Sequence, residues 1–423
     1  MPKTLIYCTN GFPGDIYSEK TFVESELQAM RRAFDRIILL PCDRTPRVMG
    51  YDKSLPDGVL ADWSLMDDRL THSRLFKIFW TFHPFVLRSL LTMAGEARTP
   101  SQWVKGLFQA INTVTIGRVV RKVVRRYGLT PADTVFYSLW FHNSAAAMAR
   151  IAAKEGWHMA TRAHTSDIYD EQMVFRSRRM RDRLLSSVDR VFSISGHGRD
   201  YLASRFPRHA AKFMHIPLGS TRIFSPDSGE RETGPRRDET VFLTVARLDP
   251  VKRLDLIMDA LAEVARRNPE RTISWRVIGD GECMTDLRHK AARISLPNFS
   301  VRFEGMLGNR EIQRRYAADP PDWFVMMSYS EGVPVSMAEA MSYGVPVIST
   351  DVGSVAELAD NKCAILLPRD IDAEAAADSL QPVIFDSKRR DNMGNAARDR
   401  WEAGFDSSVL SQRVTAILDS LIS

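Results

Sequence analysis

Residues 330–350 read SEGVPVSMAEAMSYGVPVIST, and the pattern of this stretch indicates the fold. The apolar run PDWFVMMS at 321–328 comes before it, a turn with Gly and Pro follows, and residues 336–343 have the composition of a short helix. Gly344 suits the left-handed position that ends a helix, and a second apolar run starts at Val345. Strand, turn, helix and strand in this order predict one unit of a parallel α/β sheet.

The same alternation of short apolar runs and helical segments extends through both halves of the chain. We therefore predict an α/β fold with two Rossmann-like, doubly wound domains that face a central cleft. The predicted domains are 1–220 and 240–400, joined by the polar linker 221–239, and a C-terminal helix in 401–423 is expected to cross back. The predicted strands are 4–9, 36–41, 134–140, 158–163, 190–195 and 213–218 in the first half, and 240–247, 273–278, 301–304, 323–328, 345–349 and 363–367 in the second.

The composition is that of a folded protein from a reducing compartment. Of the 423 residues, 44% are hydrophobic and 26% are charged, which is ordinary for a globular chain. The four cysteines lie far apart and form no Cys-x-x-Cys pair, which argues against a disulfide framework or a structural zinc site. The N-terminus shows no signal peptide, and charged residues and a proline interrupt the apolar region 74–95, so we expect no spanning helix there.

Positive charge is concentrated in the first half of the chain. Residues 1–220 contain 32 Lys and Arg against 20 Asp and Glu, a net charge of +12, and the remainder has a net charge of −6. This asymmetry predicts an anionic partner for the first half. The run RVVRKVVRR at 118–126 fits either a helix on an anionic membrane surface or an ordinary solvated helix face. Residues 74–126 are the predicted region of peripheral membrane contact.

Two carboxylates, Glu331 and Glu339, stand in a segment that is otherwise small and apolar. Glu331 lies in the predicted turn and Glu339 in the first half of the helix, so both can face a ligand at the carboxyl edge of the sheet. A carboxylate there accepts hydrogen bonds from ligand hydroxyls better than a neutral side chain does. The alternative for Glu339 is a capping box with Ser336, and the alternative for Glu331 is an ordinary surface acid.

The turn after the predicted strand 240–247 collects positive charge. Asp249 and the following proline read as the start of a helix, with Lys252 and the following arginine in its first turn and Arg247 just before it. Cations are unfavourable at the positive end of a helix unless an anion such as a phosphate binds there. Salt bridges to Asp249 or Asp255 are the ordinary alternative.

The next turn contains Gly279 and Gly281, which permit close approach of a ligand or simply a tight turn. No G-x-G-x-x-G fingerprint occurs there, which argues against a dinucleotide-dependent enzyme.

These motifs together resemble family 4 of the retaining glycosyltransferases, which have the GT-B fold. Glu331-x7-Glu339 is similar to the family's E-x7-E signature, and ARLDPVK at 246–252 is similar to its R-L-x-x-x-K diphosphate clamp. Phe303-Glu304-Gly305 resembles a landmark between them, and the agreement covers roughly residues 240–368. Looser equivalents of bacterial polysaccharide and lipopolysaccharide members are SEKTFVESEL at 18–27, RAHTSDIYD at 162–170 and VFSISGHGRDYL at 191–202.

The resemblance implies a role for each matching residue of the second half. Arg247 and Lys252 would neutralise the donor diphosphate, Glu339 would hold the nucleotide ribose, and Glu331 would contact the donor sugar near the reacting carbon. The residues that are expected to line the substrate site are Asn10, Gly11, Gly14, Asp167, Gly279, Gly281, Gly332, Val333, Ser336 and Glu339.

In the first half, the loop Asn10–Gly14 would close over the phosphates and His164 would lie near the donor sugar. Asp167 is able to fix the imidazole ring, although a histidine at a strand end is also often an ordinary hydrogen-bonded core residue. The departures from the family pattern are Ala246, Arg253 and Ser354, which stand where glycine is common.

The predicted function is transfer of a sugar from a nucleotide-diphosphate donor, a UDP- or GDP-sugar, to an acceptor hydroxyl with retention. We expect no cofactor and no metal, because Arg247, Lys252 and helix N-termini would stabilise the leaving diphosphate. The expected acceptor is a lipid-linked oligosaccharide, an exopolysaccharide or a lipopolysaccharide intermediate. The expected location is the cytoplasm, at the inner face of the cytoplasmic membrane, with no nucleic-acid partner.

Other functions fit parts of the pattern. A GT-B sugar-nucleotide epimerase or hydrolase would use the donor alone, and a transferase could act on a small soluble acceptor. A non-catalytic sensor of sugar nucleotides would be expected to lack part of the clamp or one glutamate, and both are complete here. A nucleic-acid binder would explain the basic first half, but no recognised module occurs in it.

Overall fold

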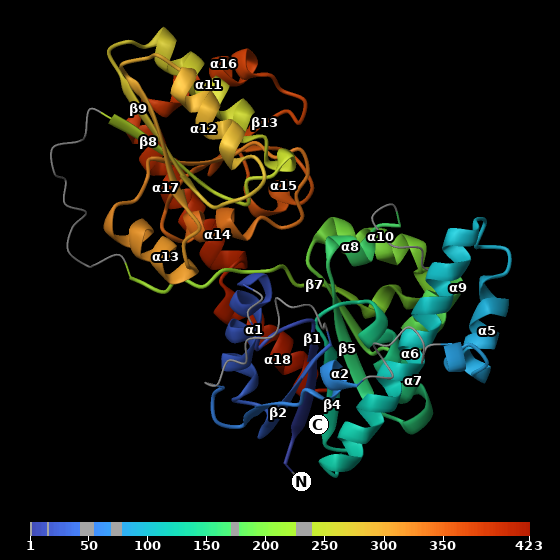
Figure 1. Ribbon diagram of the computed structural model, residues 1–423. Helices are drawn as coiled ribbons and strands as arrows, with labels where there is room; N and C mark the ends of the chain where they lie inside the picture. The colour runs from blue at the N-terminus through green and yellow to red at the C-terminus, as the bar shows by residue number, and fades with distance from the viewer. Residues whose placement is uncertain (1, 15–16, 43–54, 69–77, 171–176, 226–238) are drawn as a thin grey trace. The chain divides into compact units, whose positions relative to one another are not determined.

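The computed structural model describes residues 2–14, 17–42, 55–68, 78–170, 177–225 and 239–423. It contains two compact units, one made of Met1–Pro217 with Ser408–Ser423 and the other of Leu218–Ser407. Each unit is built on its own parallel sheet with helices on both faces (Figure 1). The predicted α/β fold with two doubly wound domains is confirmed.

The sheet of the first unit has seven strands in the order β3-β2-β1-β4-β5-β6-β7, and every neighbouring pair is parallel. The order reverses between β1 and β4, which creates the crevice at the carboxyl edge where such sheets bind ligands. The strands are β1 Thr4–Thr9, β2 Arg36–Pro41, β3 Val59–Ala61, β4 Thr134–Ser138, β5 His158–Ala163, β6 Arg190–Ser193 and β7 Phe213–His215.

Alternate residues of these strands point to opposite faces, and each face has its own apolar core. Leu5 and Tyr7 of β1 pack with α1 and α18, whereas Ile6 and Cys8 pack with α6, α7 and α10. The helices of this unit are α1 Tyr17–Met30, α2 Ser64–Asp67, α5 Pro84–Met93, α6 Pro100–Arg126, α7 Asn143–Glu155, α8 Thr165–Ile168, α9 Arg178–Ser186, α10 Gly196–Arg205, a 3₁₀ helix Pro207–Lys212, and α18 Ser407–Asp419.

The run RVVRKVVRR forms the C-terminal end of α6. Its four valines are buried in the core between α6 and the sheet. Three of its arginines are bound by carboxylates from other parts of the unit. The ion pairs are Arg118 with Asp68, Arg121 with Glu155 and Arg126 with Asp62, at 2.5, 2.6 and 2.8 Å. The valines beside the cations are therefore not available to a membrane, whereas Lys122 and Arg125 are exposed, and contact of this basic face with a membrane stays a prediction.

The sheet of the second unit has six parallel strands in the order β10-β9-β8-β11-β12-β13, with its own reversal between β8 and β11. The strands are β8 Glu239–Val245, β9 Thr272–Ile278, β10 Phe299–Gly305, β11 Trp323–Met326, β12 Val347–Thr350 and β13 Ala364–Leu367. The helices are a 3₁₀ turn Pro250–Lys252, α11 Leu254–Arg267, α12 Met284–Arg293, α13 Asn309–Ala318, α14 Val335–Ser342, α15 Val355–Leu358, α16 Ala373–Ile384 and α17 Ser387–Gly404.

The boundaries between the units differ from the predicted ones by several residues. The chain enters the second unit at Leu218, and residues 218–225 of the predicted linker pack there; Ser220, for example, bridges to Asp406. Residues 226–238 lie outside the described residues. The predicted return at 401 falls inside α17, and the chain rejoins the first unit at Ser408. The last helix, α18, then buries Leu410, Val414 and Leu418 in the core beside α1.

Two further features concern the length of the helices and the state of the cysteines. None of the helices in the described ranges is long and apolar enough to cross a membrane. All four cysteines are free thiols.

Candidate active site

Two glycines bring the turns after β8 and β9 into backbone contact. Gly279 has φ +139°, and a Cβ atom at this position would lie 1.8 Å from the carbonyl oxygen of Ala246. A Cβ atom on Gly281 would lie 2.5 Å from the carbonyl oxygen of Leu248. Both glycines therefore serve contact within the protein, and this contact fixes the turn that carries Arg247.

The turn after β8 starts a short 3₁₀ helix, Pro250–Lys252, with Asp249 as its N-cap and Pro250 at its first position, as predicted. Arg253 has the left-handed value φ +48°, and the α-helix α11 begins only at Leu254. Lys252 therefore lies in one 3₁₀ turn and outside α11, so the argument from the dipole of an α-helix does not apply to it. Arg253 tolerates a position where glycine is common because its guanidinium donates to the carbonyl oxygens of Met327 and Ser328, at 2.7 and 3.3 Å.

The structure brings Lys252 and Glu331 together. Lys252 Nζ lies 2.5 Å from Glu331 Oε1, and their side chains are 18% and 9% exposed. Arg247 is 80% exposed, and its guanidinium lies 3.0 Å from a carboxylate oxygen of Asp249. The ordinary salt-bridge alternative thus describes Arg247, whereas Lys252 pairs with the acid of the E-x7-E signature.

The backbone of Glu331 is held by the turn after β12. Gly353 has φ +57°, and a Cβ atom there would lie 1.9 Å from the carbonyl oxygen of Glu331. The N–H of Ser354 donates to the carbonyl oxygen of Gly332 at 3.3 Å. Gly332 and Val333 are half-buried in this turn. The carboxylate that binds Lys252 is therefore carried on a rigid support.

Glu339 does not form the capping box with Ser336. The N-cap of α14 is Pro334, without a side-chain cap, and Ser336 lies inside the helix. Glu339 is instead 6% exposed and accepts a hydrogen bond from the side-chain amide of Asn309, at the start of α13. Burial raises the pKa of Glu339 to about 7, although the hydrogen bond from Asn309 lowers it. The alternative in which Glu339 caps the N-terminus of α14 is therefore excluded.

A chain of buried hydrogen bonds links Glu339 to the segment that enters the second unit. Gln313 donates to the side-chain oxygen of Asn309 at 3.0 Å and accepts from Tyr343 Oη at 3.0 Å. The same Gln313 oxygen accepts from the backbone N–H of Ile223 at 2.8 Å. The surroundings of the buried carboxylate are thus fixed by contacts that are distant in sequence.

The glycine loop of the first unit is occupied by an internal carboxylate. The N–H groups of Asn10, Gly11 and Phe12 donate to Glu19, at 3.1, 2.8 and 3.2 Å. Glu19 is buried and also accepts from the indole N–H of Trp140 at 2.6 Å. In this state these three N–H groups are not available to a phosphate, so the expected contact of this loop with the donor is not seen.

His164 lies against the same indole. Its ring stacks on that of Trp140 with a centroid distance of 4.1 Å, and burial lowers the pKa of His164 to about 3, so the imidazole is neutral. Nδ1 of His164 has no hydrogen-bond partner among the described residues and lies 3.9 Å from Asp167. Asp167 accepts from the backbone N–H groups of Phe141 and His164, at 3.1 and 3.5 Å, and so fixes the backbone around the ring.

The predicted residues therefore gather in two groups, one in each unit. In the first unit, the loop closed by the hydrogen bond from Gly14 to Gly11, at 2.7 Å, connects through Glu19 and Trp140 to His164. In the second unit, the turns after β8, β9 and β11 carry Arg247, Lys252, Gly279, Gly281, Glu331, Gly332 and Val333, and α14 carries Ser336 and Glu339.

Sequence reasoning missed Glu19, Trp140 and Asn309 as parts of these groups. The stretch SEKTFVESEL contains Glu19, but nothing in its own pattern separates this acid from Glu24 and Glu26. Asn309 follows a strand and a glycine, and this pattern indicates a position at the start of a helix but not a contact with Glu339.

Among the described residues, no group of three or more His, Cys, Asp or Glu side chains is arranged to hold a metal ion. One Asp-x-Asp triplet, Asp370-Ile371-Asp372, occurs in the chain. Its second aspartate caps α16 by accepting from the N–H of Ala375 at 2.9 Å. This triplet is thus used to start a helix.

Comparison with known proteins agrees with this geometry. The family model described as glycosyl transferases group 1 matches residues 228–400. A GDP-mannose-dependent monoacylated alpha-(1-6)-phosphatidylinositol monomannoside mannosyltransferase of Corynebacterium glutamicum is 26% identical over 299 residues, 67% of this chain and 76% of that protein. A D-inositol 3-phosphate glycosyltransferase of Kribbella flavida is 23% identical over 306 residues, 67% of this chain and 70% of that protein.

Solved structures share the fold over the whole chain. Anabaena Alr3699/HepE, in complex with UDP and glucose, has a TM-score of 0.62 at 17% identity, covering 99% of this chain and 100% of that one. A glycosyltransferase from Rickettsia africae has a TM-score of 0.70 at 13% identity, covering 100% and 99%. Residues 228–400 therefore match the group 1 glycosyl transferase model, and the whole chain shares the fold of solved glycosyltransferases, the GT-B fold.

Proposed function

We propose that this protein is a retaining glycosyltransferase of family 4 that moves a sugar from a nucleotide diphosphate to a lipid-linked acceptor. The observation that carries the proposal is the pairing of Lys252 with Glu331 beside the exposed Arg247, at the carboxyl edge of the second sheet. Two cations and one carboxylate are what a site needs to hold a diphosphate and the hydroxyls of the sugar attached to it.

Donor binding would exchange the partners of these groups. In the free protein the positive charge of Lys252 is balanced by Glu331, and that of Arg247 by Asp249. The diphosphate would take over both cations and release the Glu331 carboxylate to accept hydrogen bonds from the sugar hydroxyls. The ion pair therefore keeps two partly buried charges balanced until the donor arrives.

Glu339 is the proposed partner of the nucleotide ribose. Its carboxylate is buried, lies on a rigid helix and uses one oxygen to accept from Asn309. A ribose diol would supply two further donors, which favour the ionised carboxylate against the effect of burial.

In the proposed reaction the bond between the anomeric carbon and the diphosphate oxygen breaks, and both its electrons leave with the nucleotide. The acceptor oxygen forms the new bond on the same face of the sugar, and its proton passes to an oxygen of the leaving phosphate. Arg247 and Lys252 would stabilise the negative charge that grows on the diphosphate, which is the kind of electrostatic term that dominates many active sites. We propose that no metal or cofactor is required.

The donor class follows from the diphosphate site and from the relatives. The mannosyltransferase relative is GDP-mannose-dependent, and the HepE structure holds UDP and glucose. We therefore propose a UDP- or GDP-sugar as donor. The first two curated relatives are named for phosphatidylinositol mannoside acceptors and the third for inositol 3-phosphate, so phosphorylated acceptors of both lipid and soluble kinds occur among the relatives.

The acceptor is proposed to be lipid-linked, and the protein to work in the cytoplasm at the membrane surface, because large apolar side chains are exposed in the first unit. They gather on α5, on the residues before it and on the N-terminal half of α6, and we call this set the α5–α6 apolar patch. Its members are Ile78, Phe79, Phe82, Leu87, Leu91, Trp103, Val104 and Phe108. Exposed patches of this kind mark interaction sites. Residues 74–77 of the predicted contact region lie outside the described residues.

The test is release of nucleotide from a panel of UDP- and GDP-sugars, with bacterial lipid extract as acceptor and with a chelator present. We expect release that depends on the acceptor, and we expect Lys252→Gln to lower it by about 10²–10³. Arg293→Gln, which removes an exposed cation elsewhere in the same unit, is the matched control. Equal activity of the two variants would refute the proposed site, and donor turnover without acceptor would favour an epimerase or a hydrolase.

A further inference from the structure

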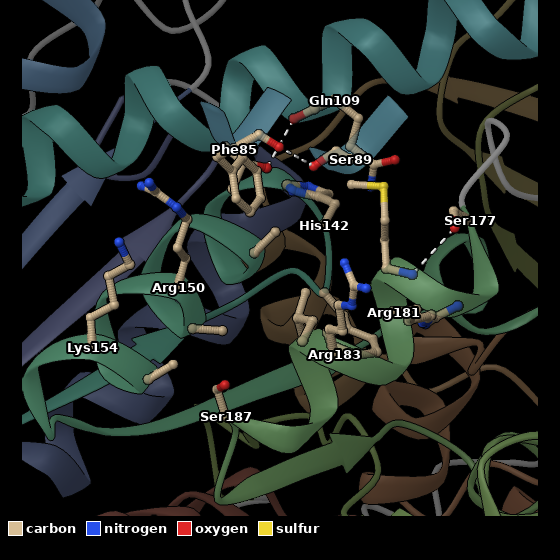
Figure 2. Close-up of a pocket in the computed structure, with 17 residues that line it drawn as sticks. Phe85, Ser89, Gln109, His142, Arg150, Lys154, Ser177, Arg181, Arg183 and Ser187 are labelled. Carbon is tan, nitrogen blue, oxygen red and sulfur yellow. Dashed lines mark hydrogen bonds between the residues drawn. The ribbon is translucent and has the colours of Figure 1, made fainter. Parts of the chain in front are cut away.

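The first unit contains a cavity of about 250 Å³ between α5, α6, α7 and α9 (Figure 2). One part of its wall is apolar, from Phe85, Phe141, Met180 and Leu184. The volume corresponds to roughly eight water molecules, which is room for a head group rather than for a whole lipid. The cavity lies beside the small apolar cluster that joins α5 to α6.

The charged side chains of this wall are all positive. Arg150, Lys154, Arg181 and Arg183 line the cavity, and no Asp or Glu is among the described residues that do so. Arg181 is committed to the carbonyl oxygen of Asp167, and Arg183 donates to Thr92 at 2.7 Å. The other two lie one helical turn apart on α7, side by side in Figure 2.

Arg150 is a partly buried cation whose hydrogen-bonding capacity is incompletely used by the described residues. Its guanidinium lies 4.6 Å from the centroid of the Phe85 ring, and its Nε is buried with no hydrogen-bond partner among the described residues. No carboxylate of the described chain lies within ion-pair distance of Arg150 or Lys154, whereas the neighbouring Arg121 is paired with Glu155. Glu155 attracts Arg150 only from beyond ion-pair distance, and Lys154 is exposed to solvent. Two cations without an ion-pair partner beside an apolar wall fit an anion that carries an apolar part.

The cavity is connected by stacked rings to the group around His164. His142 lines the cavity, and its ring is stacked with that of Trp140 at a centroid distance of 5.9 Å. Trp140 in turn stacks on His164. Stacked rings therefore join the cavity wall to the group around His164, which the resemblance places near the donor sugar.

Two helices carry both the cavity wall and the α5–α6 apolar patch. Phe85 and Ser89 of α5 face the cavity, while Leu87 and Leu91 of the same helix are exposed. On α6, Gln109 and Thr113 face the cavity and the exposed side chains lie toward the N-terminal end. Exposed cations, Arg88, Arg98 and Lys105, stand between the exposed apolar residues. This mixture is typical of surfaces that insert into an anionic bilayer.

We propose that the cavity binds the phosphate group of an anionic membrane lipid through Arg150 and Lys154, while the α5–α6 apolar patch lies in the bilayer. This inference rests on the proposed transfer to a lipid-linked acceptor and assigns the part of the protein that holds the acceptor's phosphate. The phosphate displaces water from the two cations, and the apolar wall covers the first carbons beside it.

The first experiment measures flotation of the full chain with phosphatidylcholine vesicles, with and without phosphatidylglycerol, at an ionic strength of about 0.15 M. We expect binding that depends on phosphatidylglycerol, and we expect Arg150→Gln/Lys154→Gln to weaken it about thirtyfold. The matched control is Arg32→Gln/Arg208→Gln, which removes two exposed arginines of the same unit. An equal loss in the control would show that only net charge matters and would overturn the proposal.

A second variant distinguishes binding of the lipid inside the cavity from attraction by the overall positive charge of the protein. Ala153 lines the cavity and is exposed, so Ala153→Leu fills part of the space without changing the charge or the core. We expect it to weaken vesicle binding at least fivefold, and we expect binding of a short-chain, soluble phosphatidylglycerol to weaken in parallel. Unchanged binding of both probes would overturn the proposal.

Two further measurements assign the source of the phosphate and keep the two proposals apart. Phe82→Ser/Leu91→Ser should abolish flotation but leave binding of the soluble lipid intact, and free glycerol phosphate should compete only weakly. Strong competition by glycerol phosphate would indicate a soluble phosphorylated ligand and overturn the lipid assignment. Lys252→Gln should float normally, so loss of transfer there reports on the donor site alone.

Discussion

Glu339 gives the sharpest prediction, because its protonation affects the free energy of unfolding and, in the proposed site, the affinity of the protein for the donor. Burial raises the pKa of Glu339 from 4.5 to about 7. Between these two values the folded protein keeps a proton that the unfolded chain has lost, so the free energy of unfolding falls as the pH rises from 4.5 to 7. The difference corresponds to roughly 3 kcal/mol, and Glu339→Gln should recover most of it at pH 8.

Donor affinity should change with pH in the opposite direction. In the proposed site the ribose hydroxyls donate to the ionised Glu339 carboxylate, so a donor that binds below pH 7 would first have to displace the proton. The affinity should therefore fall by up to tenfold for each pH unit below about 7, or roughly thirtyfold between pH 8 and pH 5.5. In Glu339→Gln the affinity should be lower at pH 8 by roughly 5–30-fold, the difference between charged and neutral acceptors, and should not depend on this group.

The assay is calorimetric titration of a UDP- or GDP-sugar into both proteins at pH 5.5, 7 and 8, with thermal unfolding in the same buffers. The sugar-linked diphosphate does not titrate in this range, and the variant corrects for any other group that does. We expect the ratio of the two affinities to approach one at pH 5.5. A ratio that stays constant from pH 5.5 to pH 8 would refute the assignment of Glu339 to the ribose.

Three further changes test the structural argument by chemical denaturation. Gly279→Ala should lower the free energy of unfolding by more than about 4 kcal/mol, because the new methyl group would meet the Ala246 carbonyl. The control Gly404→Ala lies in open space at the end of α17 and should leave the free energy of unfolding unchanged or raise it by up to about 1 kcal/mol. Similar values for both variants would contradict the contact. Glu19→Gln should cost about 2–4 kcal/mol, because three backbone N–H groups and an indole lose a charged acceptor, and no change would mean that the loop holds itself. Arg162→Met should cost about 3–5 kcal/mol by leaving the buried Glu26 unpaired, and addition of Glu26→Gln should restore most of this loss; a double variant no better than the single one would argue against the pair.

The parts of the fold that the sequence predicts are those governed by local patterns. The strand from Thr4 to Thr9 and the strand from Arg36 to Pro41 have the predicted bounds, because apolar runs between turns have few other conformations in a parallel sheet. Gly344 has φ +70° at the end of α14, as its place after the helical segment predicted. The pairing of Lys252 with Glu331 could not be read from the pattern, since 79 residues separate them.

The wrong predictions have a common cause, which is competition from distant groups. The start of α11 moved to Leu254 because the guanidinium of Arg253 finds carbonyl acceptors after β11. Ser336 lost its capping partner because Asn309, 30 residues away, binds Glu339. The burial of the valines in the basic run of α6 could not be predicted either, because the carboxylates that pair with three of its arginines come from the residue after α2, from α7 and from the segment after β3. Each pattern was compatible with two environments, and only tertiary contacts decide between them.

The return of α18 to the first unit has a consequence for synthesis of the protein. The core beside α1 includes Leu410, Val414 and Leu418, so this face of the first unit stays uncovered until the ribosome has added about two hundred residues after Pro217. At about 5–20 residues per second this takes roughly 10–40 seconds. The second unit is one continuous stretch, Leu218–Ser407, and can fold during that interval. The first unit is then completed last, and nascent chains that stall before residue 418 would present an open apolar surface to chaperones.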